Sequence, residues 1–89
     1  MAALFHINII TPGRVVYEAE ASSLVVPAQA GYLGVLAHHA PIIAQLKPGT
    51  ITLRDPHGKP TQFNLNSNGF LEFSENRATL LLDSLELPS

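Results

Sequence analysis

The chain has 89 residues, less than the usual length of one domain, so the sequence predicts a single domain over residues 1–89. Charged residues make up 13%, about half of the roughly 25% of an average soluble domain, while the 46% of hydrophobic residues excludes intrinsic disorder. Five Lys and Arg against seven Asp and Glu give a net charge of −2, which argues against a nucleic-acid partner. So few charges predict a largely apolar or neutral surface, which is typical of a subunit covered by another protein.

Cysteine is absent, which excludes disulfides, thiolate zinc sites and cysteine nucleophiles. The uncharged stretch 21–46 has the length of a membrane-spanning helix. Pro27, Gly31, Gly34 and Pro41 interrupt it, so we expect no insertion into a membrane. The amino terminus lacks the cationic start and the long apolar block of a secretory signal, so we expect no export.

Apolar and polar residues alternate in short segments from one end of the chain to the other, as in half-buried β-strands. In chain order, the predicted inward positions are Phe5, Ile7 and Ile9, then Ile51 and Leu53, Phe63 and Leu65, Leu71 and Phe73, and Ala78, Leu80 and Leu82. Turn-forming residues separate these segments at Thr11 to Gly13, Pro27 to Gly31, Pro41, Lys47 to Gly49, Asp55 to Gly58, Ser67 to Gly69, and Glu75-Asn76. We find no helical periodicity. The pattern predicts an all-β fold, a flattened antiparallel sandwich of about ten short strands.

Three segments depart from this alternation because they are apolar on both faces. They are Leu24-Val25-Val26, Ile42-Ile43 and Leu80-Leu81-Leu82. A strand in an isolated sandwich usually has one solvated face. These segments therefore indicate a central strand, a corner between the sheets, or an outer face docked on another protein.

Four histidines are the candidate metal ligands, but their spacing does not favour a metal site. His38 and His39 are adjacent, so on a strand they would point to opposite faces. A cupin-like barrel places a glutamate soon after its histidine pair, whereas the next glutamate here is Glu72. We therefore predict no metal site. His6 is interpreted as a surface or interface residue and His57 as a turn residue.

Glu18 and Glu20 would share one strand face, a geometry that perturbs a pKa when it is buried but more often forms a solvated face. Glu72 and Glu75 form a second pair. We find no nucleophile elbow, no phosphate-binding loop and no dinucleotide-binding loop. The sequence thus predicts no catalytic residue, no cofactor and no enzyme. Its few cationic side chains are dispersed, so we also expect no binding of ATP.

The middle of the chain carries a resemblance to a known family. The relevant residues are Gly31-Tyr32-Leu33-Gly34-Val35-Leu36, then His39-Ala40-Pro41-Ile42-Ile43, then Leu46-Lys47-Pro48-Gly49. This stretch resembles the signature of epsilon subunits of F-type rotary ATP synthases. Flanking matches are Ile10-Thr11-Pro12, Leu24-Val25-Val26-Pro27, Asn68-Gly69-Phe70-Leu71-Glu72 and Leu81-Leu82-Asp83-Ser84. Many members have Pro-Gly immediately before His-Ala-Pro, where this chain has Ala37-His38, so the shape of that loop is left open.

The resemblance implies a non-catalytic subunit in the central stalk (the rotor) of a proton-translocating ATP synthase. Such a subunit couples the gamma subunit to the ring of membrane c subunits, and it lies peripherally on the cytoplasmic face of the bacterial inner membrane. By matched position, the loop that faces the c ring contains Gln29, Ala30, Gly31 and Tyr32. The residues that face gamma, by the same matching, are His38, His39, Ile42 and Ile43.

Members of this family continue past the sandwich into a helical hairpin that can restrain ATP hydrolysis. The present sequence stops at Leu87-Pro88-Ser89, before such a hairpin, either because the protein is naturally short or because the sequence was cut at the domain boundary. If the protein is naturally short, the resemblance implies the coupling role without that restraint. The alternative from another class is a stand-alone β-sandwich module that binds a ligand or a protein. Such a module would bind its ligand or partner through the loops around Tyr32 and His38-His39.

Overall fold

The computed structural model describes residues 3–86, and within them the chain folds into nine strands and no helix. The strands are β1 Phe5–Thr11, β2 Arg14–Ala21, β3 Ser23–Ala28, β4 Gly31–Leu36, β5 Ile42–Leu46, β6 Gly49–Arg54, β7 Pro60–Leu65, β8 Gly69–Ser74 and β9 Arg77–Leu82. The all-β class is confirmed, with nine strands in place of about ten. Residues Leu87-Pro88-Ser89, after which the resemblance implies a helical hairpin, lie outside the described residues.

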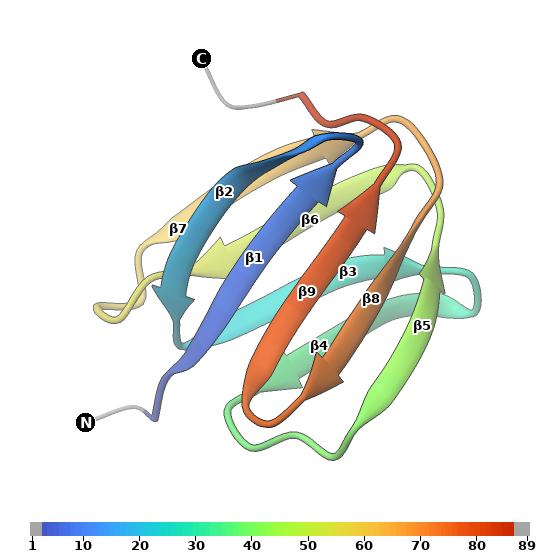
Figure 1. Ribbon diagram of the computed structural model, residues 1–89. Helices are drawn as coiled ribbons and strands as arrows, with labels where there is room; N and C mark the ends of the chain where they lie inside the picture. Colours follow the sequence, from blue (N-terminus) through green and yellow to red (C-terminus); the bar gives the residue numbers. More distant parts are fainter. Residues whose placement is uncertain (1–2, 87–89) are drawn as a thin grey trace.

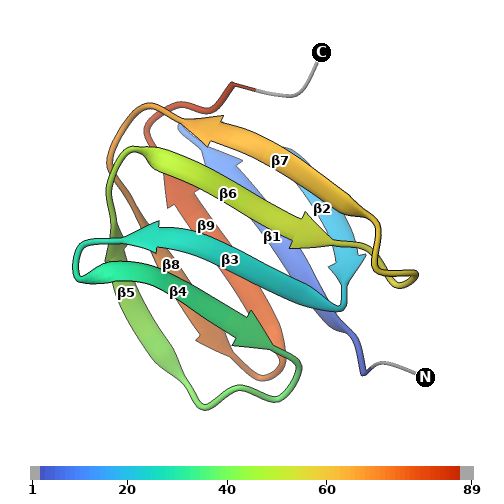
Figure 2. The same cartoon turned by 180° about the vertical axis from the view of Figure 1, so that it is seen from behind.

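The strands form one sheet that folds over itself into a sandwich of two layers (Figures 1 and 2). The strand order is β2-β1-β9-β8-β5-β3-β6-β7, and β4 pairs with the free edge of β3. One layer holds β2, β1, β9, β8 and β5, and we call it the front layer. The other, the back layer, holds β4, β3, β6 and β7. Among the named strands of residues 3–86, the sheet passes from one layer to the other through one pair, Ala28 with Leu46.

One strand pair differs from the antiparallel sandwich that the sequence predicts. Strands β1 and β9 run parallel, with Ile7 opposite Ala78 and Ile9 opposite Leu80. The other strand pairs of the described residues are antiparallel. A period of two residues specifies which side chains point inward, but it contains no information on the direction of the neighbouring strand.

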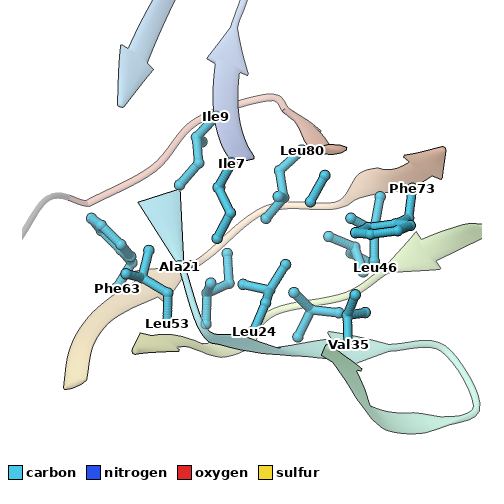
Figure 3. Packing of buried hydrophobic residues seen from close by; sticks show 14 of the residues in the cluster. Ile7, Ile9, Ala21, Leu24, Val35, Leu46, Leu53, Phe63, Phe73 and Leu80 are labelled. Carbon is cyan, nitrogen blue, oxygen red and sulfur yellow. The ribbon is translucent and has the colours of Figure 1, made fainter. Parts of the chain in front are cut away.

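The core lies between the two layers, and every inward position predicted from the alternation is buried. Figure 3 shows Ile7, Ile9 and Leu80 of the front layer facing Leu24, Leu53 and Phe63 of the back layer. Two edge-to-face aromatic pairs pack in the core. The ring centroids of Phe5 and Phe73 are 5.6 Å apart, and those of Tyr17 and Phe63 are 5.0 Å apart. Such pairs contribute packing beyond the area they bury.

The segments that are apolar on both faces present one residue each to the outside. Val25, Ile43 and Leu81 are 37%, 73% and 48% exposed, while their neighbours Leu24 and Leu80 are fully buried. Within residues 3–86 no strand covers these three side chains. Strands β3 and β9 are central in their layers, and β5 lies where the two layers meet, so the central-strand and corner interpretations both agree with the structure. The outward side chains also leave an outer apolar face.

The turn expected at Pro27 to Gly31 is shorter than predicted. Strand β3 continues through Ala28 and β4 begins at Gly31, which leaves only Gln29 and Ala30 in the turn. Pro27 has no N–H group to donate, but its carbonyl oxygen accepts a hydrogen bond from Lys47 N at 2.9 Å. Gly31 has φ of +129°, a conformation that residues with a Cβ atom rarely adopt.

Most of the uncharged stretch 21–46 folds into β3, β4 and β5. In the part of the chain that the structure describes, no helix has the length and apolar character needed to cross a membrane.

Candidate interaction surfaces

The four residues predicted to face the c ring lie together at the β3–β4 turn, and all are exposed. Gln29 is tied to the end of β5, because its backbone N donates to Gln45 O at 2.9 Å. The turn therefore has a fixed position relative to the strand where the front layer ends, although it projects from the side of the molecule (Figure 1).

Tyr32 is 61% exposed, yet its orientation is fixed. Thr50 N donates a hydrogen bond to the Tyr32 hydroxyl oxygen at 3.1 Å. The same hydroxyl lies so close to Gly49 that a Cβ atom there would come within 2.8 Å of it. Glycine at position 49 thus leaves room for Tyr32 to fold back over the start of β6, and the predicted c-ring loop presents one defined surface.

His38 and His39 lie in the connection between β4 and β5 and not on a strand. The rule that adjacent strand residues point to opposite faces therefore does not concern them. His39 N donates to Leu36 O at 3.2 Å and closes a turn. Within this turn His38 has φ of +63°, in the left-handed region that favours glycine. The His38 side chain is exposed, whereas the His39 ring packs edge-on against Phe73 with centroids 5.9 Å apart.

Ile42 and Ile43, which begin β5, point in opposite directions. Ile43 is the most exposed large hydrophobic residue of those described, whereas Ile42 packs against the core. An open groove of about 360 Å³ adjoins them and is lined by Pro41, Ile42, Ile43, Glu72, Phe73 and Ser74. Of the four residues predicted to face gamma, His38 and Ile43 are outward, His39 is half-buried, and Ile42 contributes mainly to the core.

The structure also reveals an apolar row that the sequence analysis did not single out. It crosses four neighbouring strands of the front layer, where Val15 is opposite Ile10, Ile10 is opposite Leu81, and Leu81 is opposite Phe70. Val15 and Phe70 are 52% and 50% exposed. We call these four residues the outer row. An open groove of about 390 Å³ runs beside Ile10, Phe70 and Leu81.

The outer row was missed because its members come from both ends of the sequence. The doublets Ile9-Ile10 and Val15-Val16 are apolar on both faces and were the available signal. A β-bulge between Ile9 and Ile10 shifts the register so that Val15 is paired with Ile10. Only the pairing of β1 with β9 then brings Ile10 next to Leu81.

The remaining candidate residues for chemistry lie on solvated surfaces. His6 Nδ1 lies 3.3 Å from Glu20 Oε1, and His6 Nε2 lies 3.0 Å from Asn8 Oδ1. Glu18 and Glu20 share a face as predicted, but their side chains are 58% and 56% exposed and do not form a buried acid pair. In residues 3–86 no group of three or more His, Asp or Glu side chains is arranged so that it could hold a metal ion. His57 lies in the β6–β7 turn, as predicted.

Comparison with known proteins identifies the family. Residues 4–88 match the family model described as ATP synthase, delta/epsilon chain, beta-sandwich domain. The chain belongs to this family. The ATP synthase epsilon chain of Moorella thermoacetica is 43% identical over 86 residues, which cover 97% of this chain and 63% of that relative. The epsilon chain of Latilactobacillus sakei is 44% identical over 82 residues, covering 90% and 56%. The chain thus spans roughly three fifths of the length of these relatives.

Solved structures share the fold of the family domain. A chain in the mitochondrial ATP synthase of Euglena gracilis superposes with a TM-score of 0.87 at 18% identity, covering 97% of this chain and 54% of that one. A chain in the central stalk and c ring of the Tetrahymena thermophila enzyme gives 0.75 at 15% identity, covering 97% and 68%. At such identities the likeness concerns the fold alone. The resemblance inferred from residues 31–49 is thereby confirmed for family and fold.

Proposed function

We propose that the chain is a non-catalytic rotor subunit in the central stalk of a proton-translocating F-type ATP synthase. It would couple the gamma subunit to the c ring on the cytoplasmic face of a bacterial inner membrane. The observation that supports this most strongly is the family match over residues 4–88. The two curated relatives named above, from Moorella thermoacetica and Latilactobacillus sakei, are both epsilon chains of ATP synthases.

The outer face of the front layer is the part of the molecule best suited to gamma. Ile43 is 73% exposed, and the outer row lies on the same face across β8, β9, β1 and β2, with Glu72 and Gln45 between Ile43 and Phe70. Strand β5 connects Ile43 to the outer row, because Gln45 is paired with Phe70 and lies two residues from Ile43 on the same strand face. An apolar face of this extent favours a protein partner. We assign His38, His39 and Ile42 to the margin of this surface.

The c ring would contact the turn that contains Gln29, Ala30, Gly31 and Tyr32. Strand β5 links this turn to the gamma-facing surface, since it begins at Ile42 and its other end is bonded to the turn. Hydrogen bonds Gln29 N to Gln45 O and Lys47 N to Pro27 O, each 2.9 Å long, fasten that end. The subunit would act as a rigid wedge through which torque passes along a paired backbone.

The binding of the purified chain to the gamma subunit of the same complex tests this assignment. Replacing Ile43 by Asp places a charge where an apolar contact is proposed, so we expect the dissociation constant to rise at least about tenfold, or roughly 1.4 kcal/mol. Leu36→Asp is the matched control, because Leu36 is 64% exposed on the outer face of the back layer. Equal binding of the Ile43→Asp variant and the parent chain would contradict the assignment.

Co-purification tests the function as a whole. A rotor subunit isolates from native membranes with the large complex, whereas a stand-alone binding module does not. A chain that leaves the membrane fraction without the other synthase subunits would favour the module.

A further inference from the structure

Asn76 makes more contacts between distant segments than its place in a surface turn requires. It lies in the turn between β8 and β9, where Ser74 is paired with Arg77. Glu75 and Asn76 have φ of +52° and +58°, as in a type I′ turn, and asparagine tolerates this conformation well. The turn therefore accounts for the backbone of Asn76 but not for its side chain.

The side chain of Asn76 joins two other segments. Its Nδ2 donates to Leu4 O at 2.9 Å, and its Oδ1 accepts a hydrogen bond from His38 N at 2.7 Å. A carbonyl oxygen faces one end of the amide and an N–H group faces the other. Only this orientation of the amide satisfies both partners.

The bond to His38 lies at a strained position of the chain. His38 has φ of +63°, which is unfavourable for a residue with a Cβ atom. Its N–H group belongs to the peptide plane of Ala37 and His38 and donates to the Asn76 carbonyl oxygen at 2.7 Å. The hydrogen bond fixes this peptide plane where the chain enters the left-handed residue, so it restrains the turn that requires that conformation.

The conformation of His38 determines where His39 lies. The turn closes through His39 N and Leu36 O, and the His39 ring then packs in a T-shaped arrangement with the ring of the fully buried Phe73. His39 Nδ1 also donates to Ala40 O at 2.6 Å. If His38 left the left-handed region, the direction of the chain into Ala40 and Pro41 would change and the ring contact would be lost.

We propose that Asn76 is the positioning residue for the surface formed by His38 and His39. Its Oδ1 holds the β4–β5 turn in the single shape that this surface needs, in a chain that has histidine where the turn favours glycine. The assignment of that surface to the gamma subunit rests on the proposed function, whereas the positioning itself does not.

A set of variants of the whole 89-residue chain tests the proposal. Asn76→Gly removes both side-chain bonds and still permits the turn at positive φ. His38→Gly removes the need for stabilisation of the left-handed conformation, so the double variant isolates the coupling between the two sites. Asn76→Asp keeps an acceptor for His38 N but cannot donate to Leu4 O.

The NMR signals of the His39 ring, which are displaced by the adjacent Phe73 ring, and hydrogen exchange of the residue 38 amide are the readouts. We expect Asn76→Gly to move the His39 signals toward those of an exposed histidine and to speed the exchange at least tenfold. Asn76→Asp and the double variant should retain the parent His39 signals. If Asn76 only stabilised the β8–β9 turn, His38→Gly would not restore the parent His39 signals in the double variant.

Unchanged His39 signals in Asn76→Gly would overturn the proposal, as would an Asn76→Asp variant that folds but loses them. If Asn76→Gly does not fold, the comparison of Asn76→Asp with the parent chain still decides. Binding to gamma separates the two claims. A displaced His39 with unchanged gamma binding supports the positioning and contradicts the proposed place of these histidines at gamma.

Discussion

Phe63 illustrates how much a single side chain contributes to a core of this size. It is 1% exposed and packs against Tyr17 across the two layers. Phe63→Ala removes these contacts and leaves a cavity, so we expect the free energy of unfolding to fall by about 3–5 kcal/mol. That is a large share of the roughly 5–15 kcal/mol by which domains are stable. Urea denaturation measures the change.

Phe70→Ala is the matched control for Phe63→Ala, because Phe70 is 50% exposed on the outer face. The same substitution there should cost much less stability. Equal losses at the two positions would mean that Phe63 does not point into the core.

Gly69 is required because of a close approach of the backbone. A Cβ atom at this position would lie 2.6 Å from Leu81 O and 2.6 Å from Leu82 Cδ2. The carbonyl belongs to the paired strand β9 and cannot move away, so Gly69→Ala should destabilise the fold by roughly 1–3 kcal/mol. Thermal unfolding tests this.

Gly34→Ala serves as the control for Gly69→Ala, since nothing lies within 4 Å of a Cβ atom there and its φ is not positive. We expect it to be neutral or slightly stabilising. A large loss at Gly34 would show that position 34 does not tolerate a side chain.

At the scale of an element, the β6–β7 turn depends on one carboxylate. Asp55 Oδ1 accepts hydrogen bonds from His57 N at 2.8 Å and from Lys59 N at 2.9 Å. The bond from the Lys59 backbone holds the pKa of Asp55 below its ordinary value of 3.8. The fold thus favours the ionised carboxylate of Asp55. At pH values above 3.8, the ordinary pKa, the carboxylate is charged and accepts both hydrogen bonds.

As the pH falls through the lowered pKa of Asp55, its contribution to the turn is lost. We expect the amide shifts of His57 and Lys59 to titrate together, with a midpoint below 3.8, the ordinary aspartate value. NMR of the chain over an acid pH series measures this. Asp55→Asn, which has no carboxylate at this position, should show no such step. A midpoint at or above the ordinary value would contradict the turn geometry.

At the scale of the whole molecule, the outer row unites strands from both ends of the chain. If it belongs to the proposed gamma-facing surface, Phe70→Asp should weaken gamma binding at least about tenfold. Because Phe70 is half exposed, the free energy of unfolding should change by only about 1 kcal/mol. Parallel binding and denaturation measurements test this, and a loss of stability without a loss of binding would remove the row from the surface.

The sequence by itself determined which residues face the core in five of the nine strands of residues 3–86. Alternation fixes the inward set in β1 and in β6 to β9 because side chains of a strand point to opposite faces in turn. The turn at Pro12-Gly13 is equally local, since Gly13 has φ of +85° and proline precedes it. Family membership was also readable, because the residues of 31–49 that carry it are contiguous.

Only the tertiary structure decided how those strands are combined. The doublet Ile42-Ile43 has no local feature that says which residue points inward, and pairing with β8 settles it. The parallel neighbour of β1, the outer row, and the bond between Asn76 and His38 all join segments that are distant in the sequence. A pattern of period two records the two faces of a strand, whereas its neighbour, direction and register follow from packing of the whole core.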